Sequence, residues 1–178
     1  MAKFYFGMNQ SLDGYVDHDN AAMVTSPRLY RHYIEQVRGL TGSIYGRRMY
    51  EIMRYFDDEQ PDWTEPVREF GAAWRAQPKW VVSRTLTSVG PNATLISDDI
   101  EATIRRLKSE LDGPVDIAGT KLARSVGDWG LIDQYNLYLH PVVVGSGTPF
   151  FAGLRSPLRL VESRMMDEAV IKLSYVPA

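Results

Sequence analysis

Three short loops combine small residues with cationic side chains, and each of them follows a run of apolar residues. They are Gly46-Arg47-Arg48, Ser83-Arg84-Thr85 and Gly119-Thr120-Lys121. Backbone N–H groups at the start of a helix bind anions, and cationic side chains strengthen such contacts. Each loop alone is typical of an ordinary connection with solvated charge. Together the loops favour a ligand that carries several phosphates, such as a dinucleotide.

The known nucleotide-binding fingerprints are absent from the sequence. No Gly-x-Gly-x-x-Gly follows the first predicted strand, and Ala118-Gly119-Thr120-Lys121 is not a Walker A loop. A Rossmann dehydrogenase and a P-loop kinase are therefore disfavoured.

Strands that alternate with helices would position these loops. Apolar runs predict strands over 3–8, 42–46, 78–82, 92–96, 114–118 and 133–140, the last continuing through 142–144, and a hairpin over 158–165 and 169–176. Helices are expected from Ser26-Pro27 to Gly39, over 47–53, from Thr64, over 98–111 and from Gly119, with Asp98 and Glu101 at capping-box spacing. Residues 9–17 are expected to form a polar loop. This order predicts one α/β domain over residues 1–178 with a mixed sheet.

Composition excludes several classes of protein. The chain of 178 residues has a net charge of -2, which argues against a nucleic-acid binder, and it has no cysteine for disulfides or zinc. No apolar run approaches a membrane span, and the N-terminus turns polar too early for a signal peptide, so we expect a cytoplasmic protein.

Metal and base-stacking sites are not expected either. Asp17-His18-Asp19-Asn20 begins like a calcium loop but lacks the glycine and the closing glutamate. The remaining histidines are scattered along the chain. The tryptophans are expected in the core or in turns rather than as base-stacking platforms: Trp63, Trp74, Trp80 and Trp129.

Several segments resemble the dihydrofolate reductase-like superfamily, and most closely the reductase domain of riboflavin-biosynthesis deaminase-reductases. The matching segments are Ser11-Leu12-Asp13-Gly14, Gly46–Glu51, Val81–Arg84 and the stretch from Ile117 to Phe151. The resemblance covers essentially the whole chain. It implies a three-layer α/β/α fold whose mixed, mostly parallel central sheet is closed by a C-terminal antiparallel hairpin.

The resemblance implies a reductase that takes hydride from NADPH. It places Gly46, Arg47 and Arg48 at the cofactor phosphates, Ser83, Arg84 and Thr85 at the adenosine 2′-phosphate, and Gly119, Thr120, Lys121 and Leu122 at the pyrophosphate. Two arginines and a serine around a monoester phosphate make physical sense, because charge-assisted hydrogen bonds are the stronger kind. They would favour NADPH over NADH.

The resemblance also implies a substrate side. It places the loop from Asn9 to Gly14 across the nicotinamide, with Asn9, Ser11, Asp13, Gly145 and Gly147 toward the substrate. Asp13 is the only acid of that loop and so the candidate proton donor, although its place before a glycine also suits a tight turn, and water could supply the proton instead.

The chain departs from its relatives in ways that bear on the substrate. Relatives often carry Gly-Gly where this chain has Ala118-Gly119, and residues 26–34 lack the carboxylate that grips folate in dihydrofolate reductases. The zinc deaminase signature is also missing. A small heterocycle, such as a 5-amino-6-(5-phosphoribosylamino)uracil-like compound, is expected, and the resemblance implies a homodimer. A non-catalytic nucleotide- or small-molecule-binding protein, or a purely structural dimer module, are the alternatives.

Overall fold

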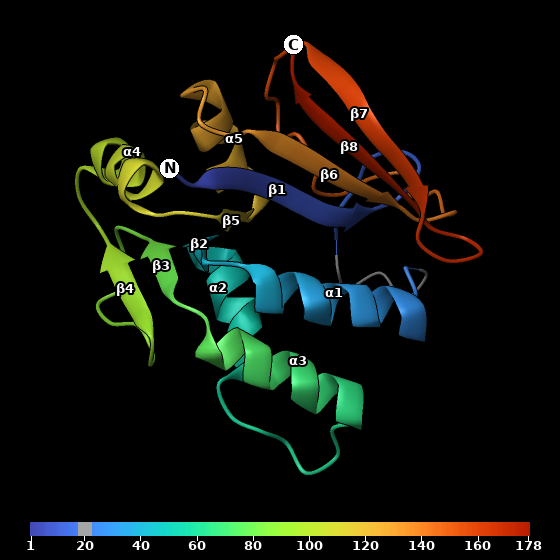
Figure 1. Ribbon diagram of the computed structural model, residues 1–178, viewed down its shortest axis with the longest axis horizontal. Helices are drawn as coiled ribbons and strands as arrows, with labels where there is room; N and C mark the ends of the chain where they lie inside the picture. Colours follow the sequence, from blue (N-terminus) through green and yellow to red (C-terminus); the bar gives the residue numbers. More distant parts are fainter. Residues whose placement is uncertain (18–22) are drawn as a thin grey trace.

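A single sheet of eight strands runs through the computed structural model, which describes residues 1–17 and 23–178 (Figure 1). The strands are β1 (Lys3–Gln10), β2 (Gly42–Gly46), β3 (Lys79–Val82), β4 (Ala93–Ile96), β5 (Pro114–Ala118), β6 (Gln134–Leu139), β7 (Leu158–Met165) and β8 (Ile171–Pro177). Their order across the sheet is β4-β3-β2-β5-β1-β6-β8-β7. The strands from β4 to β6 are parallel, whereas β8 runs antiparallel to β6 and β7. The predicted mixed, mostly parallel sheet with a C-terminal hairpin is confirmed.

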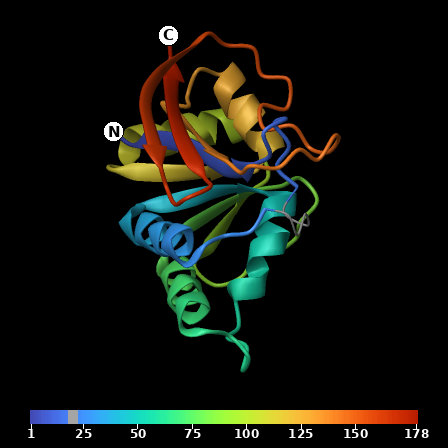
Figure 2. The ribbon, with the colours of Figure 1, turned by 90° about the vertical axis from the view of Figure 1, so that its right-hand side faces the viewer.

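Helices cover both faces of the sheet and give three layers (Figures 1 and 2). The helices are α1 (Pro27–Gly39), α2 (Arg47–Met53), the short 3-10 helix η1 (Arg54–Phe56), α3 (Glu65–Ala76), α4 (Ile100–Glu110) and α5 (Thr120–Asp128). On one face, Ile104 of α4 and Val126 of α5 join the apolar core around Ile117. On the other, Tyr50 of α2 and Trp74 of α3 pack together in a second cluster. The expected three-layer α/β/α architecture is confirmed.

The helix starts follow local sequence signals in one case and depart from them in another. Ser26 caps α1 as predicted, because its side chain accepts a hydrogen bond from the Leu29 amide at 3.2 Å and Pro27 follows. The capping box predicted for Asp98 and Glu101 is wrong. Asp99 occupies the cap position of α4 with a left-handed φ of 43° and no side-chain bond, while Asp98 accepts a hydrogen bond from the Ser97 hydroxyl.

Two strand boundaries also differ from the prediction. β1 continues through Asn9 and Gln10, which were expected in a loop, because the Gln10 carbonyl accepts a bond from the His140 amide at 2.8 Å. Residues 142–144 do not continue β6, which ends at Leu139. Pro141 has no N–H to donate, and the chain turns there so that the Val142 carbonyl accepts a bond from the Leu12 amide.

The calcium-like spacing from Asp17 falls largely on residues 18–22, outside the described residues. Within residues 1–17 and 23–178, no helix is long and apolar enough to cross a membrane. No group of acids and histidines within the same residues could hold a metal ion.

Candidate functional site

The sheet brings the predicted loops together at one edge. β2 lies between β3 and β5, with Gly46 opposite Val82 and Tyr45 opposite Ala118. The loops that follow these parallel strands therefore leave the sheet side by side, which is where open α/β sheets bind ligands. Contact is close, since a Cβ added to Gly119 would lie 3.5 Å from the Met49 Cβ.

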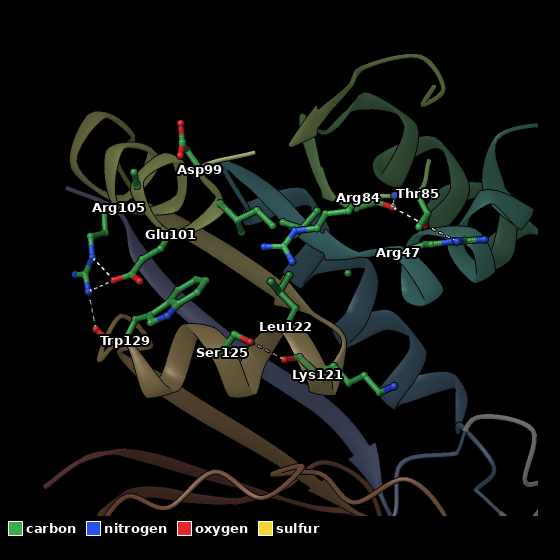
Figure 3. Close-up of a pocket in the computed structure, with 15 residues that line it drawn as sticks. Arg47, Arg84, Thr85, Asp99, Glu101, Arg105, Lys121, Leu122, Ser125 and Trp129 are labelled. Carbon is green, nitrogen blue, oxygen red and sulfur yellow. Dashed lines mark hydrogen bonds and ion pairs between the residues drawn. The ribbon is translucent and has the colours of Figure 1, made fainter. Parts of the chain in front are cut away.

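A large cavity opens between α4, α5 and the loop after β3, with a volume of about 1030 Å³ (Figure 3). Predicted residues line one part of it: Gly46, Arg47, Ser83, Arg84, Thr85, Lys121 and Leu122. Residues of α4 and the end of α5, which were not predicted, line the rest: Asp99, Ile100, Glu101, Ala102, Arg105, Ser125 and Trp129, with Val82 of β3. Figure 3 shows the Arg84 side chain reaching toward the middle of this space. We call it the outer cavity.

A second cavity of about 520 Å³ continues from the first. Both are lined by Gly46, Arg47, Lys121 and Leu122, which form a shared throat. The second cavity, here the inner cavity, adds the predicted residues Arg48, Gly119 and Thr120. Its remaining lining was not predicted: Met8, Val16, Asp17, Met49, Glu51, Ile52 and Thr148. A ligand with two linked halves could therefore occupy both spaces at once.

Cations without acidic partners surround the throat. Arg48, Arg84 and Lys121 are exposed and form no ion pair within the described residues. Arg47 instead pairs with Glu51 at 2.8 Å and donates to the Thr85 hydroxyl at 2.5 Å. Positive charge that is not neutralised by neighbours attracts an anionic ligand. The site thus has the charge expected for a phosphate-bearing molecule.

The loop after β3 is held in shape by its first residue. The Ser83 side chain is buried, and its hydroxyl oxygen accepts hydrogen bonds from the amides of Thr85 at 3.2 Å and Leu86 at 3.0 Å. These bonds fix a tight turn, so Ser83 positions the exposed Arg84 and Thr85 beside the outer cavity.

Asp13, the predicted proton donor, does not line either cavity. Its carboxylate accepts hydrogen bonds from the amides of Val144 at 3.2 Å and Gly145 at 2.7 Å. The Ser11 side chain and these amides lower the pKa of Asp13. A carboxyl group that stays ionised is a poor proton donor near neutral pH, and the contacts favour the turn role that its position before a glycine also indicates.

The other predicted substrate-side residues also lie outside the cavity linings. Asn9 faces α1, where its side-chain oxygen accepts bonds from the Tyr33 hydroxyl and from His140. Ser11 is fully buried and bonds the Tyr15 amide at 3.0 Å. Gly145 and Gly147 have φ values of 81° and 146° and shape the loop after β6.

That loop and the loop after β1 are tied together. Val16 donates to the Thr148 carbonyl at 2.9 Å, and the Thr148 amide donates to Asp17 at 2.6 Å. The two loops therefore lie together, and the residues of these loops that reach the inner cavity are Val16, Asp17 and Thr148. The alternation of β1, which turns Met8 toward the inner cavity and Asn9 toward α1, was the signal that could have identified Met8.

Comparison with known proteins agrees with this fold. The chain is 26% identical over 174 residues to the uncharacterized protein YyaP of Bacillus subtilis, covering 93% of this chain and 89% of that protein. A putative riboflavin biosynthesis protein from Shewanella superposes with a TM-score of 0.71 at 19% identity, over 99% of each chain. A Thermotoga maritima deaminase/5-amino-6-(5-phosphoribosylamino)uracil reductase gives a TM-score of 0.68 at 14% identity, over 99% of this chain and 57% of that one.

The fold extends to dihydrofolate reductase. The Enterococcus faecalis enzyme, in complex with NADP(H), superposes with a TM-score of 0.62 at 11% identity, over 98% of this chain and 96% of that one. The family model of the RibD C-terminal domain matches residues 3–172. Because this match spans nearly the whole chain, and the open mixed sheet agrees with it, the chain belongs to the RibD C-terminal domain family.

Proposed function

We infer that this protein is an NADPH-dependent reductase that transfers hydride to a small heterocyclic substrate. One observation carries the proposal, namely that two cavities of different character meet at a throat of glycine backbone and cations. A dinucleotide has matching parts, because its phosphates lie between two nucleosides. The names of the structural relatives, which include reductases and an NADP(H) complex, support the same assignment.

The residues of the throat fit the phosphates of such a cofactor. Gly46 and Gly119 let the backbone approach a ligand closely, and Gly119 has a φ of 109°, a conformation that favours glycine. Lys121 and Arg47 reach both cavities, and Thr120 adds a hydroxyl in the inner one. These groups would bind the pyrophosphate through charge-assisted hydrogen bonds.

A 2′-phosphate would lie beside the turn after β3. Arg84 has no ion-pair partner there within the described residues, and Arg47 is held nearby by the Thr85 hydroxyl. Two guanidinium groups suit a doubly charged monoester, whereas NADH offers only a hydroxyl at that position. We therefore propose selectivity for NADPH.

The inner cavity would hold the nicotinamide together with the substrate. When bound, the cofactor supplies a hydride, and the substrate then needs a proton. Because Asp13 lies outside the cavity and its pKa is lowered, we propose that water delivers this proton. A planar ring, such as the uracil ring of a 5-amino-6-(5-phosphoribosylamino)uracil-like compound, would pack against apolar side chains of this cavity. These are Met8, Val16, Met49 and Ile52.

Calorimetric titration with NADPH and NADH tests the proposal. Wild type should bind NADPH more tightly than NADH. Arg84→Ala should weaken NADPH binding about tenfold or more, since a charged hydrogen bond contributes about 1.5–3 kcal/mol, and should leave NADH binding nearly unchanged. Arg106→Ala, which removes an exposed arginine outside both cavities, is the matched control.

The outcome separates the proposal from its alternatives. Failure to bind either nucleotide would refute the reductase assignment. Binding without NADPH oxidation in the presence of heterocyclic substrates would favour a non-catalytic binding protein. The position of Asp13 outside the cavities also supports that alternative.

We also propose that the protein is a homodimer. β7 is an edge strand with exposed apolar side chains at Leu160, Val161 and Met165. Such an edge is available for pairing with another chain. Sedimentation equilibrium should give twice the chain mass, and Val161→Lys should shift the mass toward the monomer.

A further inference from the structure

Trp129 differs from the other tryptophans in its surroundings. Trp63 and Trp74 are buried, and their indole N–H groups donate to the hydroxyls of Tyr55 at 2.7 Å and Tyr45 at 2.9 Å. Trp80 is half-buried like Trp129, but it packs against the core and lines neither cavity. The Trp129 ring is half-buried, lines the outer cavity, and its N–H has no partner within the described residues. Trp129 lies in the turn after α5 and packs against the main core, as expected, and it also lines the outer cavity, which was not expected.

Trp129 and the cationic Lys121 lie at opposite ends of the outer cavity's α5 wall. Lys121, Ser125 and Trp129 line it from successive turns of α5 and its C-terminal cap. Eight residues separate Lys121 from Trp129, which is roughly 12 Å along a helix at 1.5 Å per residue. Figure 3 shows the indole at one end of the helix and Lys121 at the other. An extended adenosine diphosphate spans a similar length.

The backbone of Trp129 is anchored from α4. Arg105 donates to the Trp129 carbonyl at 3.2 Å and is itself held by Glu101 through bonds of 2.9 and 2.7 Å. Gly130 follows with a φ of 69°, which turns the chain directly after the ring. One side of the indole packs against the main core, so the ring is supported from behind. A supported aromatic ring at a cavity wall is the arrangement that stacks nucleobases.

We propose that Trp129 is the base platform of the cofactor site and stacks on the adenine of the bound dinucleotide. The inference rests on the proposed function and adds to it the residue that recognises the base. Lys121 and Arg47 then hold the phosphates at the throat, Arg84 lines the same outer cavity as the ring, and the indole determines how far the adenosine half extends along α5.

Binding of cofactor fragments tests this assignment. Calorimetry is used because the substitution removes a fluorophore, and the probes are NADPH, adenosine 2′,5′-bisphosphate and reduced nicotinamide mononucleotide. Trp129→Leu should weaken binding of NADPH and of the adenosine fragment by about 5- to 150-fold, the factor expected for one aromatic–base stack. It should leave binding of the nicotinamide fragment unchanged. Trp129→Phe should restore most of the lost affinity, because it keeps an aromatic face.

The results distinguish failure of this inference from failure of the proposed function. Absence of NADPH binding in wild type would refute the function, and with it the platform. NADPH binding that is equally tight in wild type and Trp129→Leu would refute the platform alone. Equal losses for both fragments, or no recovery in Trp129→Phe, would also overturn it, because the ring would then act through the fold. Thermal unfolding of both variants shows directly whether the fold is retained.

Discussion

Asp116 should make the stability of this protein depend on pH, and replacing it by asparagine should remove that dependence. The residue lies in the middle of β5, opposite Tyr5 of β1 and Ser43 of β2. Its carboxyl group has no hydrogen bond or cationic partner within the described residues. Burial alone therefore raises the pKa of Asp116 to about 7 from its usual 3.8.

The size and sign of the effect follow from this shift. Between pH 3.8 and about 7 the folded protein keeps a proton on Asp116 that the unfolded chain has released. The unfolding free energy therefore falls as pH rises through this window, and the loss is complete above it. A shift of about three units corresponds to about 4 kcal/mol. Because the side chain is half-buried, this value is a ceiling, and we expect about 2–4 kcal/mol.

Urea unfolding followed by circular dichroism from pH 4 to pH 8 measures the effect. Asp116→Asn should match wild type near pH 4 and exceed its unfolding free energy by about 2–4 kcal/mol at pH 8. Asp62→Asn, at an exposed position, is the control and should follow the wild-type curve. Parallel curves for wild type and Asp116→Asn would refute the reasoning, since they would mean that Asp116 ionises alike in the folded and unfolded states.

Three further predictions concern other parts of the molecule. Gly14→Ala should lower the free energy of unfolding by about 1–2 kcal/mol, because Gly14 has a φ of 89° in open space. Gly147→Ala should lower it more, because the new Cβ would lie 1.9 Å from Asp17, and thermal unfolding compares the two variants. Burial lowers the pKa of Lys79 to about 8 from 10.5, so the unfolding free energy should rise with pH between these values, and guanidinium unfolding of Lys79→Met should show a flatter profile. Asp13→Ala should speed hydrogen exchange of amides in residues 142–149 without changing NADPH affinity, and unchanged exchange with slower turnover would instead indicate a chemical role.

Local sequence patterns predicted most of the helices and strands, and also the glycine loops that line the cavities. Gly46 and Gly119 each end an apolar strand, and the parallel pairing of β2 with β5 brings them together as expected. Such strand–turn–helix signals depend on neighbouring residues in the sequence, and tertiary packing does not override them here. The cap of α4 was missed because Asp99 takes a left-handed conformation that spacing alone does not reveal.

The distal parts of the cavities were harder to predict because they depend on packing between distant elements. Trp129 lines the outer cavity together with residues of α4, and Arg105 of that helix donates a hydrogen bond to its carbonyl. Met8 and Thr148 meet at the inner cavity across 140 residues of chain. A single sequence gives no measure of such distances, so Met8 and Thr148 were not predicted, and the substrate side was assigned from the family resemblance to the loop that begins at Asn9.

The ties between the loops after β1 and β6 have a consequence for how this fold can change. The carboxylates of Asp13 and Asp17 accept hydrogen bonds from the main-chain amides of residues 144, 145 and 148, so the side chains of those three residues take no part in these bonds. Every amino acid except proline carries such an amide. The side chains of residues 144 and 148 can therefore be exchanged while the path of the second loop is kept. Gly145 and Gly147 are the exceptions, because their φ values are positive. New specificities could therefore arise at residues 144 and 148 by point mutation, without a change in the backbone of the loop after β6.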